Sequence, residues 1–408
     1  MREEGRLRLR ALSITILSAF ACYLAVLGLL LGARSMLNIT IPEDRAVAEA
    51  LGLSQDQVKF ASLSMQKTLA SRDDVYMIRG SSELSSTFIP SHPANVFAGQ
   101  RVGFAIDLEG RGHWQSLAHA IALGALDDSI SGRKFAFIVS SQWFEGPGVE
   151  PGAFASLFSP VQLEAFLRSP NLDKGLKDEM AKRVLELLRD GKEGYSQRTI
   201  SRFQGAGPLQ VDVALLAPLD LLKSLTLDIS DRWRSHGLFR RVVSAGHSGA
   251  AVDPGTSGPI DWTALEKTSM EDAKAKVTNN RFAVYDSYFD TYLRAHLDEW
   301  EGSRNRSLRY AGSREYGDFD LLLRVCAALH CKPFIVLAPV NGRWYDFTGA
   351  DREMRENHYA KVRTMIQEAG FKCLDLTTED YEPYVLCDIM HMGWKGWIQI
   401  DRGILESR

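Results

Sequence analysis

The chain contains little cysteine, no excess of basic residues and no segment that repeats at a fixed period. Its 408 residues include 5 cysteines, and 48 lysines and arginines are balanced by 51 aspartates and glutamates, for a net charge of -3. Because nucleic acids attract proteins through a basic excess or a basic stripe, this balance argues against a nucleic-acid partner. The hydrophobic share of 45% is enough for a substantial core.

The few cysteines also limit the possible metal and disulfide chemistry. No Cys-x-x-Cys pair occurs, so a zinc site lacks its usual ligand spacing. Cys22 lies in an apolar run, where it serves as a small apolar residue. The other four permit one or two disulfides in an oxidising compartment, or remain buried as free thiols. They are Cys326, Cys331, Cys373 and Cys387.

Residues 11–33 contain no charged side chain and are mostly aliphatic. At about 1.5 Å per residue, a helix of this length reaches roughly 34 Å, enough for a bilayer core of about 30 Å. Arginines are concentrated in residues 1–10, which places that segment in the cytoplasm and the chain after Arg34 outside. A cleaved signal peptide is the competing interpretation, but its apolar region is shorter and no good cleavage site follows. We predict an uncleaved single-pass membrane anchor.

The remainder divides into a predicted helical stalk, residues 34–70, and an extracytoplasmic domain, residues 71–408. The domain contains a predicted helical insertion at about 150–330, in which the Gly- and Pro-rich stretch 246–258 is expected to be an exposed loop. Short apolar runs separated by helical stretches predict an α/β fold with three layers, a parallel sheet between two layers of helices. The predicted strands are 74–79, 134–139, 332–339 and 371–376.

Polar motifs follow these strands, where parallel sheets usually bind ligands. Gly80-Ser81-Ser82 follows the first predicted strand, and Asp388-x-x-His391 follows the last. A serine near the start of a domain and Asp-x-x-His near its end is the chain order of SGNH-type serine hydrolases. In that arrangement, the aspartate accepts from one imidazole nitrogen and the other nitrogen takes the serine proton. The alternatives are a serine-rich turn, a core histidine and an aspartate that caps the final helix.

We predict that Ser82 is the nucleophile, and that Ser81 caps a helix whose N-terminal amides stabilise an oxyanion. The backbone amide of Gly112 or the side chain of Gln142 is expected to complete the oxyanion hole. Two polar-aromatic clusters after buried strands are predicted to contact the substrate, with loop packing as the alternative. These clusters contain Gln142, Trp143, Asn341, Trp344 and Tyr345.

Together these residues resemble the DltD family, the membrane-anchored SGNH-like protein of the D-alanylation pathway of teichoic acids. The resemblance covers nearly the whole chain. Besides the anchor, it is carried by Gly80-Ser81-Ser82-Glu83-Leu84, His92-Pro93, Gln115-Ser116-Leu117, Ser141-Gln142-Trp143-Phe144, Glu315-Tyr316-x-Asp318, the block from Pro339 to Asp346 and the block from Asp388 to Trp397. Two departures are mild: Ser140-Ser141-Gln142 replaces the family's Ser-Pro-Gln, and Met392 replaces a leucine.

The resemblance implies that Ser82, Asp388 and His391 form the catalytic triad of an acyltransferase or esterase. It implies two partners, a membrane-bound O-acyltransferase similar to DltB and a D-alanyl carrier protein similar to DltC. The acceptor is expected to be lipoteichoic acid or, in a Gram-negative envelope, a lipopolysaccharide-like glycan. Transfer through a seryl ester implies no metal and no organic cofactor. The alternatives are an SGNH-like polysaccharide O-acetyltransferase or esterase, and a non-catalytic scaffold.

Overall fold

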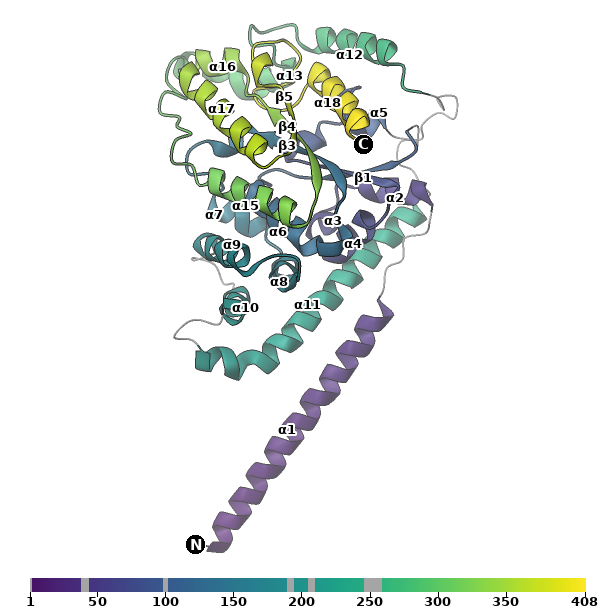
Figure 1. Cartoon of the computed structure of the whole chain (residues 1–408), viewed down its shortest axis with the longest axis vertical. Coiled ribbons are helices and arrows are strands. Elements are labelled where there is room, and N and C mark those ends of the chain that lie inside the picture. The colour runs from purple at the N-terminus through teal and green to yellow at the C-terminus, as the bar shows by residue number, and fades with distance from the viewer. Residues whose placement is uncertain (1, 38–43, 98–101, 189–193, 205–209, 246–258) are drawn as a thin grey trace.

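The domain is built on a five-stranded sheet in which every neighbouring pair of strands is parallel, as shown by a computed structural model (Figure 1). The structure describes residues 2–37, 44–97, 102–188, 194–204, 210–245 and 259–408, so the predicted loop at 246–258 lies outside the described residues. The strand order is β2-β1-β3-β4-β5. The bounds are β1 (Val75–Arg79), β2 (Ala105–Glu109), β3 (Lys134–Ser140), β4 (Lys332–Ala338) and β5 (Lys372–Asp375).

Helices cover both faces of the sheet, which confirms the predicted α/β class. One face packs against α6 (Ser116–Leu126), α15 (Glu315–Ala328) and α17 (Arg352–Glu368), and the other against α5 (Pro93–Val96), α12 (Trp262–Lys276) and α18 (Trp394–Ser407). Neighbouring strand residues point to opposite faces, so Phe137 joins one core and Ile138 the other. This double burial explains why β1, β3 and β4 are nearly continuous apolar runs in the sequence.

The edge strand β2 was not predicted, because Asp107 and Glu109 interrupt its apolar pattern. Both carboxylates are buried, and so is Lys59, which lies in α3 (Gln57–Ala61). The Lys59 ammonium donates to Asp107 Oδ1 at 3.0 Å, to the Leu108 carbonyl at 2.6 Å and to the Gly52 carbonyl at 2.5 Å. These bonds connect the N-terminal helices to the sheet and compensate for burying the ammonium.

Helices occupy the described part of the predicted stalk, but they pack against the domain. They are α2 (Arg45–Gly52), α3 and α4 (Leu63–Ala70). Val47, Leu51 and Leu69 form a buried cluster with Val75 and Ala105 of the sheet. Helix α2 begins after Asp44, whose carboxylate accepts from the Ala46 N–H. Because apolar side chains from α2 and α4 join the core, these helices belong to the folded domain.

The N-terminal helix α1 (Arg2–Met36) extends away from the domain (Figure 1). It is long and apolar enough to span a membrane over Arg6–Met36, and the apolar part is not buried against the protein. These features agree with single-pass anchoring. The long helix α11 (Gln210–Ser244) contacts it, because Tyr23 donates to the Pro218 carbonyl at 3.3 Å and Arg34 to Asp228 at 2.7 Å.

The connection from β3 to β4 is largely helical, and its second half contributes to the site described below. It begins with α7 (Pro151–Leu157), α8 (Pro160–Arg168), α9 (Lys174–Leu187) and α10 (Gly194–Gln204). After α11 and α12 come α13 (Asp286–Tyr288), a π-helical turn (Phe289–Leu293) and α14 (Leu297–Trp300). Ser159 caps α8 and accepts from the Gln162 N–H, and Asp173 caps α9 and accepts from the Leu176 N–H.

Replacing Lys59 with methionine should destabilise the protein strongly, because it leaves the buried Asp107 carboxylate without its cation. Removing one partner of a buried ion pair typically lowers the free energy of unfolding by about 3–5 kcal/mol. Chemical denaturation of the full chain in detergent micelles, followed by circular dichroism, measures the change. The control is Lys67→Met at a half-buried position, which should stay within about 0.5 kcal/mol of wild type. Equal losses in the two variants would contradict this account of β2.

Candidate functional site

The candidate nucleophile follows β1, the middle strand between β2 and β3. After Arg79 the chain runs through Gly80 and Ser81 into a short 3-10 turn, Ser82–Ser85. A Cβ atom on Gly80 would lie 2.3 Å from Glu83 Oε1, and one on Gly110 would lie 2.3 Å from the Gly80 carbonyl. The two glycines therefore allow the loops after β1 and β2 to approach closely at the carboxyl edge of the sheet.

The serine turn is held by a buried glutamate and differs from the predicted helix cap. The Ser81 N–H donates to Glu83 Oε1 at 2.7 Å, and burial raises the pKa of Glu83. The Ser81 hydroxyl donates to the Arg111 carbonyl at 3.2 Å and caps nothing. The chain forms only one 3-10 turn from Ser82 to Ser85, so the helix predicted after Ser81 is not found at this position. Glu83 organises the turn instead, a role that the sequence did not reveal.

The structure brings Ser82, His391 and Asp388 together in one hydrogen-bonded series. Ser82 Oγ lies 2.7 Å from His391 Nε2, and His391 Nδ1 lies 2.7 Å from Asp388 Oδ2. An ionised carboxylate only accepts, so Asp388 fixes the proton on Nδ1 and leaves Nε2 to accept from the serine. Residues that are 309 positions apart in the chain therefore meet at one end of the sheet.

Asp388 also holds the backbone of its own loop. Its Oδ1 accepts from the N–H groups of Met390 at 2.9 Å and His391 at 2.8 Å. Its side chain is 4% exposed. The final helix α18 begins after Gly393 and receives no side-chain cap. The alternative in which Asp388 caps the final helix is therefore wrong, because both oxygens are used within the loop.

Two opposing effects set the pKa of His391. Burial lowers it, whereas the charge and the hydrogen bond of Asp388 raise it, with a smaller contribution from Glu83. The net result is a pKa above the ordinary value of 6.5. A raised pKa makes the neutral imidazole a stronger base toward the Ser82 proton.

These side chains open into a cavity of about 610 Å³. Its wall comes from four parts of the chain: the serine turn with the residues just after it, the segment around α13 and α14, helix α16 (Gly342–Phe347), and the loop before α18. Besides Ser82, Asp388 and His391, the lining is rich in aromatic rings and contains one arginine. These residues are Phe88, Tyr285, Tyr288, Tyr292, Trp300, Arg304 and Trp344. Among these aromatic residues, only Trp344 was predicted to contact the substrate. The three tyrosines are three and four positions apart, a spacing that could have indicated one aromatic face of a helix.

The other predicted substrate contacts do not line this cavity. Trp143 is 4% exposed and packs against His119 and Phe137 in the core. Asn341 caps α16 (Gly342–Phe347) and donates to the Asp388 carbonyl at 3.3 Å, so it positions the loop. Tyr345 is buried and donates to Glu145. These side chains follow buried strands as predicted, but they point into the protein, where they pack against other rings or form internal hydrogen bonds.

The two predicted oxyanion donors lie on the loops that flank the serine. Gly112 follows β2 and is exposed, and Gln142 lies in a 3-10 turn after β3. Neither lines the cavity described above.

All five cysteines are free, and Cys326 and Cys331 are buried. Within the described residues, no group of three or more histidine, cysteine, aspartate or glutamate side chains is arranged to hold a metal ion.

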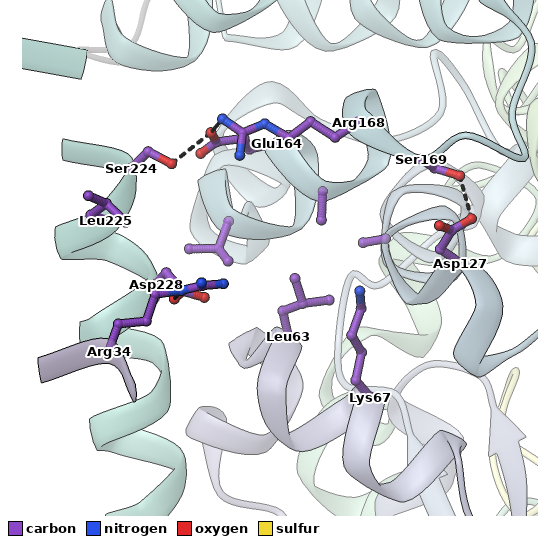
Figure 2. A pocket seen from close by; sticks show the side chains of 13 residues that line it. Arg34, Leu63, Lys67, Asp127, Glu164, Arg168, Ser169, Ser224, Leu225 and Asp228 are labelled. Carbon is purple, nitrogen blue, oxygen red and sulfur yellow. Dashed lines mark hydrogen bonds and ion pairs between the residues drawn. The ribbon is translucent and has the colours of Figure 1, made fainter. Parts of the chain in front are cut away.

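A second, smaller cavity of about 390 Å³ lies among α1, α4, α8 and α11 (Figure 2). It contains none of the three hydrogen-bonded residues. Much of its charge is neutralised within its own wall, because Arg34 pairs with Asp228 and Arg168 with Glu164. We therefore assign the candidate site to the larger cavity, where a nucleophile and a base are in contact.

The molecule is an α/β protein with hydrogen-bonded serine, histidine and aspartate side chains at the carboxyl edge of a parallel sheet. The family model described as DltD protein matches residues 52–406. Protein DltD of Bacillus subtilis (strain 168) is 31% identical over 385 residues, 91% of this chain and 91% of that protein. Protein DltD of Staphylococcus aureus (strain NCTC 8325 / PS 47) is 29% identical over 361 residues, 86% of this chain and 85% of that protein.

Protein DltD of Lacticaseibacillus rhamnosus is 26% identical over 328 residues, which cover 80% of this chain and 75% of that protein. The chain belongs to the DltD family, as its motifs predicted. Membership supports a general role in the D-alanylation of teichoic acids.

The reactivity of Ser82 should depend on pH through His391. A fluorophosphonate probe that labels activated serines should react faster as pH rises through a midpoint above 6.5, because only the neutral imidazole accepts the serine proton. Asp388→Asn should lower the midpoint, since Asp388 raises the pKa of His391, and should slow labelling by roughly 10³- to 10⁴-fold. The rate of label incorporation, measured by mass spectrometry, tests both effects.

The matched control is Ser85→Ala, since Ser85 lines the same cavity without contacting His391. This variant should be labelled like wild type, and Ser82→Ala should not be labelled at all. Labelling that persists in Ser82→Ala and disappears in Ser85→Ala would overturn the choice of nucleophile.

Proposed function

We propose that the protein transfers D-alanyl groups to a cell-envelope glycopolymer through a seryl ester formed on Ser82. The observation that supports this is the hydrogen-bonded series from Ser82 through His391 to Asp388, which opens into a cavity. A serine hydroxyl is a weak nucleophile at neutral pH and needs an adjacent, correctly oriented base. Family membership supports the D-alanyl group as the acyl group that is transferred.

In the first step, Ser82 Oγ attacks the carbonyl carbon of a D-alanyl thioester or ester while His391 Nε2 takes its proton. The bond to Ser82 forms, the bond to the donor's thiolate or alkoxide breaks, and His391 returns the proton to this leaving group. In the second step, an acceptor hydroxyl attacks the seryl ester and gives its proton to His391, which passes it to Ser82. Asp388 remains ionised and stabilises the imidazolium in both steps.

The loops after β1, β2 and β3 contain candidate donors for an oxyanion hole. Ser82 is the first residue of its 3-10 turn, and the first N–H groups of a helical turn have no partner within the turn. Its amide is therefore a candidate donor to the developing negative charge. Gly112 and Gln142 are the candidate second donors, because β2 and β3, the strands before them, lie on either side of β1.

The proposed reaction takes place outside the membrane, where the anchor would hold the domain next to the envelope polymer. A membrane-bound O-acyltransferase similar to DltB and a carrier protein similar to DltC would supply the D-alanyl group. Lipoteichoic acid is the proposed acceptor. Each added ammonium offsets a phosphate charge and weakens the attraction of cationic antimicrobial peptides to the envelope.

The D-alanyl ester content of the envelope in a deletion strain tests this proposal. The strain would carry wild-type protein, Ser82→Ala or Ser85→Ala at matched expression, and released D-alanine would be measured after mild alkaline treatment. We expect wild type and Ser85→Ala to restore the esters, and Ser82→Ala to remain at the level of the deletion strain, because it forms no seryl ester.

Full restoration by Ser82→Ala would overturn the seryl-ester route and would favour a non-catalytic scaffold. A parent strain that lacks D-alanyl esters but loses acetyl esters on deletion would replace the proposed reaction with polysaccharide O-acetylation.

A further inference from the structure

The large apolar side chains that remain exposed outside the N-terminal helix are concentrated on two neighbouring helices. Among the described residues outside α1, Phe88 and Tyr292 are exposed and line the cavity of the candidate site. The other exposed large apolar side chains all lie on α10 and α11, far from that cavity in the sequence. They are Phe203, Leu219, Leu221, Trp233 and Val243. Single exposed apolar residues are common, but several on adjoining elements usually mark an interaction surface.

The long helix α11 runs alongside the second half of α1 (Figure 1). The Tyr23 hydroxyl donates to the Pro218 carbonyl at 3.3 Å, and Arg34 Nε donates to Asp228 Oδ2 at 2.7 Å. Both helices advance in the same direction between these two contacts, so they are parallel. From Pro218 to Asp228 a helix rises about 15 Å, and from Tyr23 to Arg34 it rises about 16 Å. The two helices therefore stay in step over this length.

These contacts fix the level of α11 relative to the bilayer that α1 would cross. The charge-free stretch of α1, residues 11–33, ends just before Arg34, so this arginine marks the boundary between acyl chains and headgroups. Tyr23 lies about 16 Å from that boundary along the helix, close to half of a bilayer core of about 30 Å. Because Pro218 contacts Tyr23, the first half of α11 lies at the depth of the acyl chains.

The side chains of α11 change from apolar to cationic and aromatic at the same level. Leu219 and Leu221 come before Asp228, at acyl-chain depth, and are 60% and 42% exposed. Trp233 is 68% exposed, Arg234 is also exposed, and both follow Asp228 by about 8–9 Å. Tryptophan and arginine are favoured in the headgroup region, where an aromatic ring and a charge meet water and lipid together. This order matches the polarity of a bilayer from its core to its surface.

The described charges in the first half of α11 are compatible with that depth. Asp220 is buried, accepts from Arg198 of α10 at 2.8 Å and also pairs with Arg202. Ionisable side chains within a membrane usually pair with one another and face protein, as this aspartate does. Lys223 is exposed, and its long aliphatic side chain allows the ammonium to reach toward the headgroups.

We propose that the first half of α11, residues 216–222, is embedded in the half of the bilayer next to the domain, with Leu219 and Leu221 against lipid acyl chains. Within the described part of the chain, α1 is the helix that is long and apolar enough to span a membrane, so α11 would enter the bilayer without crossing it. A single anchor leaves a domain free to rotate and tilt. This second contact restricts both motions and is independent of the proposed acyl transfer.

Labelling by a photoreactive phospholipid tests the contact in the full-length protein. The protein is reconstituted in phosphatidylglycerol and phosphatidylethanolamine vesicles that contain a lipid with a diazirine at the end of its acyl chain. After illumination, trypsin releases residues 203–223 as one peptide, and mass spectrometry measures the attached lipid. We expect labelling of this peptide and of the α1 peptides, and only background labelling of residues 282–294, which contain the exposed Tyr292. Background labelling of 203–223 would overturn the proposal.

The matched variants place charges at exposed apolar positions of the same helix. Leu219→Asp combined with Leu221→Asp should reduce labelling of residues 203–223 several-fold, because two carboxylates oppose insertion among acyl chains. Val243→Asp is the control, since Val243 is exposed but lies about 22 Å beyond Asp228, outside the bilayer. It should be labelled like wild type. Circular dichroism melting verifies that each variant is folded, and equal labelling of all three proteins would contradict the insertion of these leucines.

The same labelling in native membranes distinguishes lipid from a membrane protein that covers α11. Membranes from the expressing strain are loaded with the photoreactive lipid before illumination. Labelling of residues 203–223 relative to the α1 peptides should equal that in the vesicles if lipid occupies this face. Labelling that occurs in vesicles but disappears in native membranes would assign the face to a protein partner and overturn the lipid contact. Ser82→Ala should be labelled like wild type, whatever its effect on D-alanyl esters.

Discussion

One buried carboxylate, that of Asp388, connects the loop before α18 to the candidate nucleophile. It accepts from two backbone N–H groups of its own loop and from His391 Nδ1. The first two bonds fix the shape of the loop, and the third fixes the tautomer and direction of the imidazole. Asn341 reinforces this arrangement by donating to the Asp388 carbonyl. Neutralising Asp388 would therefore affect both the geometry and the electrostatics of the site, because the same oxygens serve both purposes.

The parallel sheet supplies the other half of the site. Because β1 is bordered by β2 and β3, the turn that contains Ser82 is enclosed by the loops that follow them. Gly80 and Gly110 permit the close approach of two of these loops, and Glu83 accepts from the serine turn. The helical connection between β3 and β4 then contributes the aromatic wall. A rigid sheet thus positions the reactive groups, while a segment far from them in sequence shapes the space for a ligand.

The strands were predictable where their sequences were apolar and unpredictable where they were not. Burial on both faces makes β3 and β4 continuous apolar runs, a pattern that is typical of strands inside a parallel sheet. The edge strand β2 has the same burial but contains Asp107 and Glu109, and Lys59 from a separate helix pairs with Asp107 at 3.0 Å. Periodicity within one segment carries no information about such a partner. For the same reason, α2 and α4 appeared to be a stalk although their apolar side chains join the domain.

The sequence by itself determined the α/β class, the apolar N-terminal helix, membership of the DltD family and the three candidate residues Ser82, Asp388 and His391. Each depends on local composition or on the order of motifs along the chain, and both can be read directly from the sequence. Only the tertiary structure decided that Trp143 and Tyr345 are buried and that Tyr285, Tyr288 and Arg304 line the cavity. Whether an aromatic or charged side chain faces the core or a cavity depends on what packs against it, and those neighbours come from remote segments of the chain.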